Sequence, residues 1–162
     1  MDNNSMIDSL RGKYTTELFS IDESSDILTI TVNKSCIKEL VRWLKDEIGF
    51  GFLTDLCGIH IPGQTLELGV VYHLHNLPEN KRIRIKTFTT KDNPKMSSIT
   101  EIFSSANWME RETFDFYGIK FVGHPNLIRI LNVEYLDYFP MRKEYPLEDA
   151  TRSDKDDRFF GR

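Results

Sequence analysis

Hydrophobic and polar residues alternate along several stretches of the chain, a period of two that is typical of β-strands. The pattern predicts strands over residues 26–32, 52–60, 66–75 and 82–88. The last two are separated by a polar connection short enough for an antiparallel pair. A sheet with at least one antiparallel pair is therefore expected.

The strand predicted over residues 66–75 shows the clearest alternation. Five apolar residues are expected on its buried face: Leu66, Leu68, Val70, Tyr72 and Leu74. Glu67, His73 and His75 fall between them, on the face that is expected to be more polar. One side of this sheet should therefore pack against the core.

Two other stretches show the spacing of an α-helix. From the polar residues 33–35 to residue 48, five apolar residues share one face: Ile37, Leu40, Val41, Leu44 and Ile48. Gly49 is expected to end this helix. A second helix is predicted to open at Ser97 and Ser98 and to run to about Tyr117, before Gly118.

These elements predict an α+β fold, in which a mixed, largely antiparallel sheet packs with helices and an extended C-terminal tail follows. Residues 141–162 contain twelve charged residues and few apolar ones, so alone they should be mobile. Phe159 and Phe160 near the end favour a segment that orders on a partner. We expect a globular domain over residues 1–134 and a partner-wrapping segment over residues 135–162.

The second predicted helix combines charged and aromatic residues. A continuous helix would place one set of residues on a common face: Ile99, Ile102, Phe103, Ala106, Met109, Glu110, Thr113 and Tyr117. Trp108, Arg111 and Asp115 would project from roughly the opposite side, where Arg111 and Asp115 can pair across one turn.

Glu110 has two readings, a structural carboxylate that meets water or an arginine, or part of a contact with another chain. A buried carboxylate needs a partner, and Arg129, Arg142 or a cation of another chain are candidates. Trp108 beside Arg111 is typical of a protein interface, although the ring could also pack under this chain's own tail.

Composition and charge narrow the function classes. The 162 residues suit about one domain, and the net charge of −4, with basic and acidic residues interspersed, argues against nucleic-acid binding. Cys36 and Cys57 are too few for an iron–sulfur cluster, so any cluster should belong to another chain. The N-terminus lacks the features of a signal peptide and no apolar run approaches a membrane span, which favours a reducing, cytoplasmic compartment.

Intrinsic catalysis has little support in the sequence. Glu110 and Glu112 point away from each other on a helix, so they cannot flank one bond as the acids of a glycosidase do. No dinucleotide-binding or P-loop motif is present. One alternative of a different class is a stand-alone metal protein or enzyme, with four candidate groups: Cys57, His60, His73 and His75.

A dense set of residues resembles the 30-kilodalton subunit family of respiratory complex I, which supplies the C subunit of the bacterial NADH:quinone oxidoreductase. The residues that carry the resemblance lie between positions 97 and 147: Ser105-Ala106-Asn107-Trp108, Glu110-Arg111-Glu112, Asp115, Gly118, His124-Pro125, Leu127, Arg129-Ile130-Leu131 and Arg142-Lys143-Glu144-Tyr145-Pro146-Leu147.

The resemblance implies a non-catalytic scaffold subunit of the peripheral arm of a proton-translocating complex. It would dock on the large quinone-site subunit of 49 kilodaltons (the D subunit), near the iron–sulfur proteins of the arm (the B and I subunits). FMN and the iron–sulfur clusters would bind in partner subunits, with no cofactor in this chain. The complex would hold the protein peripherally at the cytoplasmic face of the bacterial inner membrane.

The resemblance also implies roles for single residues. Glu110, Arg111 and Glu112 would hold the helix to the domain and to its neighbour, while the pairs His124-Pro125 and Arg142-Lys143 would shape the start of the wrapping segment. The complete set of expected interface and locking residues is Trp108, Glu110, Arg111, Glu112, Asp115, His124, Pro125, Arg129, Arg142, Lys143, Phe159 and Phe160. A related alternative is the equivalent subunit of a membrane-bound hydrogenase or of a complex that uses ferredoxin or a deazaflavin.

Overall fold

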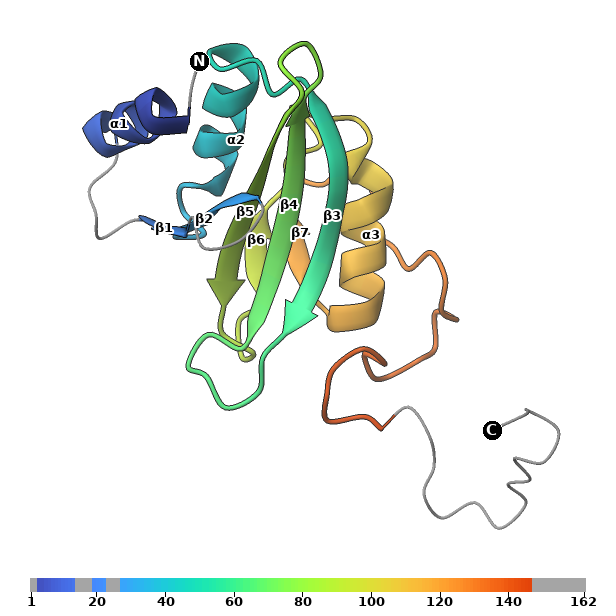
Figure 1. Cartoon of the computed structure of the whole chain (residues 1–162). Helices are drawn as coiled ribbons and strands as arrows, with labels where there is room; N and C mark the ends of the chain where they lie inside the picture. The colour runs from blue at the N-terminus through green and yellow to red at the C-terminus, as the bar shows by residue number, and fades with distance from the viewer. Residues whose placement is uncertain (1–2, 14–18, 23–26, 147–162) are drawn as a thin grey trace, which may run out of the picture.

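The computed structural model describes residues 3–13, 19–22 and 27–146, and Figure 1 shows how their elements are arranged. The elements follow in this order: α1 (Asn3–Lys13), β1 (Phe19–Asp22), β2 (Leu28–Val32), α2 (Ile37–Asp46), β3 (Phe52–His60), β4 (Leu68–Asn76), β5 (Lys81–Thr89), β6 (Lys95–Ser97), α3 (Ala106–Tyr117) and β7 (Lys120–Val122). The predicted α+β class is confirmed.

The main sheet has five strands in the order β1-β2-β5-β4-β3. The pairs β1–β2, β3–β4 and β4–β5 are antiparallel and β2–β5 is parallel, so the sheet is mixed and largely antiparallel. The predicted antiparallel pairing of the two long central strands is confirmed, with Tyr72 opposite Ile85. A small parallel pair, β6–β7, was not predicted, because three-residue strands carry too little periodicity to stand out.

One face of the sheet forms the core with the helices. Leu68, Val70, Tyr72 and Leu74 of β4 are fully buried on this inner face. The apolar stripe of α2 is buried in the same cluster, as its spacing predicts. On β3, Gly58 leaves room for the ring of Tyr117, so α3 approaches the same face closely.

Two details of β4 differ from the sequence prediction. The strand begins at Leu68, and Leu66 lies before it with an exposed side chain. On the face expected to be more polar, Val71 and His75 are also buried. The register places Lys86 opposite Val71 and Arg82 opposite His75, and cross-strand neighbours of this length interact with each other, which alternation along a single strand does not reveal.

The second helix begins later in the structure than the sequence pattern predicts. The chain forms β6 up to Ser97, and α3 starts only at Ala106. Between them the backbone turns, with the N–H groups of Ile102 and Phe103 both bonded to the carbonyl of Ile99. Ile99 and Phe103 are buried as expected, but from a turn rather than from a continuous helix.

Candidate partner-docking site

The carboxylate of Asp115 on α3 organises the segment that follows β7. Its Oδ2 accepts the backbone N–H groups of Ile130, Leu131 and Asn132 at 3.1, 2.8 and 2.8 Å. Its Oδ1 accepts bonds from Arg129 at 2.7 Å and from the Asn132 side chain at 3.1 Å. One buried side chain therefore fixes the backbone of three successive residues.

Burial by itself raises the pKa of the Asp115 carboxyl, yet the net pKa is well below its ordinary value. The N–H groups of Asn132 and Leu131 and the guanidinium of Arg129 favour the charged form strongly enough to reverse the effect of burial. Asp115 is therefore ionised at neutral pH, although none of its surface is exposed.

Arg129 extends this network along the chain. Besides its ion pair with Asp115, its guanidinium donates to the backbone carbonyls of Leu136 and Tyr138 at 2.7 and 3.3 Å, and it lies 5.3 Å from the ring centroid of Phe139. The pair of Arg111 with Asp115 that helical spacing allows is not formed, because Asp115 pairs with Arg129 instead. The segment around Arg129 lies against the side of α3 opposite the predicted apolar face, and it brings a cation to Asp115.

Arg111 also holds this segment, through backbone contacts. Its Nε donates to the carbonyl of Ile128 and its Nη2 to that of Arg129, both at 3.2 Å. Its guanidinium stacks 5.0 Å from the ring centroid of Trp108, which is 61% exposed. Trp108 and Arg111 therefore form the rim where α3 meets the segment.

The C-terminal end of α3 receives a second arginine. Arg142 donates to the carbonyl of Tyr117 at 2.8 Å and lies 4.7 Å from the ring centroid of Phe139. Gly118 ends the helix with φ of 75°, and a Cβ there would meet the Phe139 ring. Glycine is thus required twice, by its backbone conformation and by the close ring.

The chain after Arg142 reaches the sheet. The N–H of Lys143 donates to Nδ1 of the buried His60 at 2.9 Å, and Lys91 forms an ion pair with Glu144. The contacts of Arg142, Lys143 and Glu144 thus attach this part of the chain to the end of α3, to β3 and to the loop after β5.

His124 shapes the turn after β7. Its Nε2 lies 3.0 Å from the carbonyl of Asn107, and its Nδ1 accepts the N–H of Asn126 at 3.0 Å. Nδ1 is therefore the acceptor and Nε2 carries the proton. The adjacent Pro125 is exposed.

Glu110 has a different environment from Asp115. Its Oε1 accepts the N–H of Ile99 at 2.7 Å, while its Oε2 has no hydrogen-bond partner within the described parts of the chain. Burial raises the pKa of Glu110 to about 7, against the opposing effect of the Ile99 N–H and the Ser98 hydroxyl. The candidate partners Arg129 and Arg142 bind elsewhere. Glu112 is exposed on the same helix.

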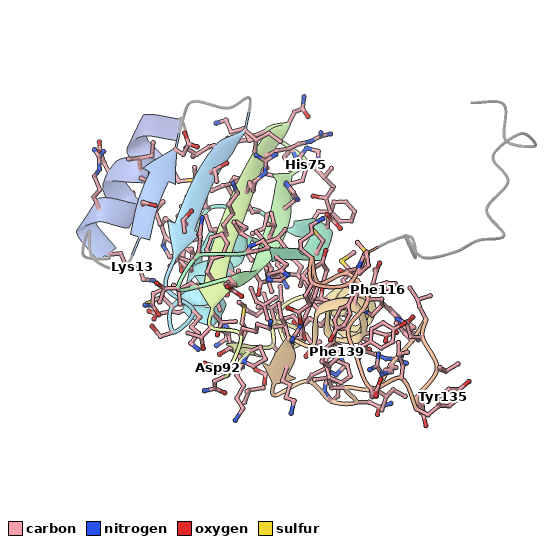
Figure 2. All side chains as sticks on the ribbon, turned by 90° about the horizontal axis from the view of Figure 1, so that it is seen from below. Lys13, His75, Asp92, Phe116, Tyr135 and Phe139 are labelled. Atoms are coloured by element: carbon pink, nitrogen blue, oxygen red, sulfur yellow. The ribbon has the colours of Figure 1, made fainter. Side chains whose placement is uncertain are left out.

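Large apolar side chains are exposed along this fixed segment. We define the segment surface by seven of them: Ile128, Leu131, Val133, Tyr135, Tyr138, Met141 and Tyr145. Tyr135 is 87% exposed and Leu131 65%. In Figure 2, Tyr135 projects from the end of the molecule that carries Phe116 and Phe139. Phe159 and Phe160 lie outside the described residues.

Comparison with known proteins identifies the family. The model of the family "Respiratory-chain NADH dehydrogenase, 30 Kd subunit" matches residues 30–151. The chain belongs to this 30-kilodalton subunit family. The resemblance found in the sequence is thereby confirmed, and it extends over the central strands as well as over the motifs around α3.

Several relatives in the 30-kilodalton subunit family match most of the chain. A protein of Citrifermentans bemidjiense, named as the C subunit of NADH-quinone oxidoreductase, is 37% identical over 93% of this chain and 94% of its own length. One of Trichlorobacter lovleyi with the same name is 34% identical over 93% and 94%. One of Methylobacterium sp. is 40% identical over 88% of this chain, but only 65% of that protein is covered.

Two solved structures share the fold. A trypsin-resistant fragment of Nqo5 aligns over 78% of this chain and all of its own, with 27% identity and a TM-score of 0.68. A chain of an archaeal membrane-bound sulfane sulfur reductase aligns over 89% of this chain and 85% of its own, with a TM-score of 0.74. At 21% identity, this second match concerns the fold alone.

The four groups of the alternative metal site do not converge. On β3, Cys57 lies on the outer face of the sheet, whereas His60 points to the inner face beside Lys143. His73 and His75 share the outer face, as predicted. Across the described ranges, no group of three or more His, Cys, Asp or Glu residues is placed to hold a metal ion.

Sequence reasoning missed several residues of this 30-kilodalton family protein. Asn132 and Phe139 complete the contacts of Asp115 and of the two arginines, but neither falls in a periodic pattern. Gly118 after the helix was the available signal for a close approach at that end.

In the parts of the chain that the structure describes, no helix is both long and apolar enough to span a bilayer.

Proposed function

We propose that this protein is a non-catalytic scaffold subunit of the peripheral arm of a proton-translocating NADH:quinone oxidoreductase. The segment surface docks on the large quinone-site subunit of 49 kilodaltons, with the iron–sulfur proteins of the arm as neighbours. FMN and the clusters bind in those other subunits and carry the electrons. The complex holds this chain peripherally at the cytoplasmic face of the bacterial inner membrane.

The observation that supports this function best is the combination of a fixed backbone with exposed apolar side chains. Residues 128–138 form no helix or strand, yet Asp115, Arg111 and Arg129 fix their backbone by hydrogen bonds. A backbone fixed in advance loses little conformational entropy when a partner covers it. Large apolar groups rarely gather on the surface of a monomer without an interaction that buries them.

Burial of the segment surface would favour docking. Complete burial of one large apolar side chain contributes about 1.5–3 kcal/mol, so the seven residues together offset the cost of association. Trp108 and Arg111 at the rim have the chemistry of interface anchors. Asp115 and Arg129 act indirectly, because they hold the segment in position rather than contact the partner themselves.

A pair of leucine substitutions tests the segment surface in the complete complex. Leu131→Asp should reduce the amount of assembled peripheral arm, because it places a charge in the contact. Leu77→Asp is the matched control, since Leu77 is 61% exposed in the turn between β4 and β5, away from the segment. Assembly is measured by native electrophoresis, and NADH:quinone turnover is normalised to assembled complex.

The two readouts separate docking from catalysis. We expect less complex with Leu131→Asp, normal turnover for each complex that does assemble, and no change with Leu77→Asp. Equal assembly of both variants would refute docking through the segment surface. Oxidation of hydrogen or reduced ferredoxin in place of NADH by the purified complex would instead identify the related hydrogenase or ferredoxin-dependent assembly.

A further inference from the structure

The five-stranded sheet has a second face, the outer face, which points away from α2 and α3. On β5 the inner residues Ile83 and Ile85 alternate with outward ones: Arg82, Arg84, Lys86 and Phe88. In Figure 2, His75 lies on the opposite side of the sheet from Phe116 and Phe139. No helix of the described residues packs on the centre of this outer face.

Basic side chains form a strip across the outer face. We define the basic strip by five residues on two adjacent strands: His73, His75, Arg82, Arg84 and Lys86. The strand register places His75 opposite Arg82 and His73 opposite Arg84. Outward residues of one strand follow each other at about 7 Å, so the three cations of β5 form a regular row.

Asp55 lies next to this row, but it faces the imidazole of His73. The Nε of Arg84 donates to Nε2 of His73 at 2.9 Å, so the imidazole proton lies on Nδ1, which faces Asp55 at 3.7 Å. Burial and the Arg84 cation lower the pKa of His73, and the ring is neutral at neutral pH. Asp55, the acid that faces this ring, therefore meets the imidazole rather than the arginines.

Arg82, Arg84 and Lys86 of the basic strip lack the ion pairs that other basic residues of the described chain form. Seven basic residues elsewhere form ion pairs with carboxylates: Arg11, Lys38, Arg42, Lys81, Lys91, Arg129 and Arg142. Among the described residues, no carboxylate lies within ion-pair distance of Arg82, Arg84 or Lys86. On a chain with net charge −4, the strip is thus a local excess of positive charge.

The chemistry around the strip fits a protein partner with carboxylates. A guanidinium binds a carboxylate through two parallel hydrogen bonds, and arginine is enriched at protein interfaces. The exposed ring of Phe52 lies opposite His75, and Phe88 lies over Gly69, so the strip has aromatic neighbours. Three cations on an acidic chain would neutralise too few phosphates for strong nucleic-acid binding.

We propose that the outer face of the sheet is a second docking surface, on which the basic strip receives an acidic surface of another subunit of the complex. The contact is independent of the segment surface, because the two lie on opposite sides of the sheet. Arg82 and Lys86 meet carboxylates directly, while Arg84 is oriented by His73. Rim charges of this kind contribute to the rate and salt dependence of association.

Zero-length cross-linking in the complete complex tests this proposal. A carbodiimide joins a lysine amine to a carboxylate only where the two touch. We expect peptides in which Lys86 is linked to Asp or Glu of another subunit, identified by mass spectrometry. Linkage of Lys86 only to carboxylates of its own chain would overturn the proposal.

A charge-reversal pair supplies the second test. Arg82→Glu together with Lys86→Glu should weaken retention of this subunit during a salt wash of the complex by about fivefold, since two exposed pairs at about 0.5 kcal/mol each amount to about 1 kcal/mol. Lys95→Glu with Lys120→Glu is the control, because both lysines are exposed on β6 and β7. Equal retention of the two double variants would overturn the proposal.

The same variants separate the two surfaces and the other classes of anion. Loss of subunit retention in the Arg82→Glu and Lys86→Glu double variant would support docking through the outer face, even if Leu131→Asp had no effect on assembly. Co-sedimentation of the complex with phosphatidylglycerol vesicles is measured in parallel. A dependence of vesicle binding, but not of subunit retention, on Arg82 and Lys86 would overturn the protein partner in favour of a lipid surface.

Discussion

Two buried carboxyl groups on α3, Glu110 and Asp115, have opposite electrostatic properties. Neither has any exposed surface, and both lie on the same helix. Burial raises the pKa of Glu110 to about 7, whereas the pKa of Asp115 is lowered. The difference shows that burial alone does not decide whether a carboxylate is charged.

The number of hydrogen-bond donors around each carboxyl group decides whether it is charged. Asp115 accepts bonds from three backbone N–H groups, the side chain of Asn132 and the cation of Arg129. Glu110 accepts the N–H of Ile99 and has one oxygen without a partner among the described residues. Asp115 holds a segment that is otherwise without regular structure. Glu110 holds the turn before α3 through the N–H of Ile99, and the pKa of its carboxyl is about 7.

Removal of the charge at Asp115 should have the largest effect. Asp115→Asn leaves the guanidinium of Arg129 without its anion and places an amide against backbone N–H groups, which should lower the free energy of unfolding by about 3–5 kcal/mol. Urea denaturation of the purified chain measures the change. Glu112→Gln, on the exposed side of the same helix, is the control and should stay within about 0.5 kcal/mol. A similar small change for Asp115→Asn would show that the network is unimportant for stability.

The pH dependence of stability should report Glu110. Its pKa rises on folding from 4.5 to about 7, so the folded state binds more protons than the unfolded state between these values. The contribution of Glu110 to the free energy of unfolding should therefore be largest below pH 4.5. It should fall by about 3 kcal/mol as the pH rises from 4.5 through 7.

Glu110→Gln should remove this decrease and should stabilise the chain at pH 8 relative to the wild type. Denaturation at pH 5 and at pH 8 measures both effects. An unchanged difference between the two pH values in the variant would assign the dependence to another group. Asp115 acts in the opposite direction, because its stabilisation is present above the ordinary carboxyl pKa and is lost as the pH falls below it.

A smaller effect is expected at the edge of the Asp115 network. Arg111→Ala removes two bonds to the carbonyls of Ile128 and Arg129 at a half-buried site, which should destabilise the chain by about 1 kcal/mol and reduce assembly of the peripheral arm. Thermal unfolding and native electrophoresis measure these two results. Arg111→Lys should restore assembly only in part, since lysine lacks the planar fork. Wild-type assembly with Arg111→Ala would contradict its role in presenting the segment.

The smallest change should follow loss of a surface pair. The ion pair of Glu144 with Lys91 lowers the pKa of Glu144, but the pair is solvated. Glu144→Gln should shift the melting temperature less than the other substitutions, and the shift should shrink further in high salt. A shift as large as that of Asp115→Asn would mean that burial is not what separates strong pairs from weak ones in this protein.

The regular elements of the fold could be predicted from the chain pattern. The apolar stripe of α2 and the strand β3 were located correctly, since each is long enough for its period to be read. The start of α3 was placed too early, because Ile99 and Phe103 continue the helical spacing although they lie in a turn. Periodicity reports which residues are buried, and it does not distinguish a helix from a turn that buries the same residues.

Several residues of the Asp115 network were selected from the sequence, but their pairing was not predicted. Asp115, Arg111 and Arg129 were all selected, yet the spacing offered Arg111 as the residue that can pair with Asp115, and the structure pairs it with Arg129. A helical wheel contains only neighbours on the same helix, whereas the partner of Asp115 arrives from fourteen residues further along. The role of the segment surface in docking remains a prediction that the assembly experiments address.

The sequence by itself determined the family, the α+β class and the set of charged residues around α3, because local periodicity and short motifs are properties of the chain. Only the tertiary structure decided that Asp115 is charged, that Glu110 titrates near neutrality and that Arg82, Arg84 and Lys86 pair with no acid of the described residues. These depend on which donors and charges meet in space, and Coulomb and hydrogen-bond energies fall off over a few ångströms regardless of distance along the sequence.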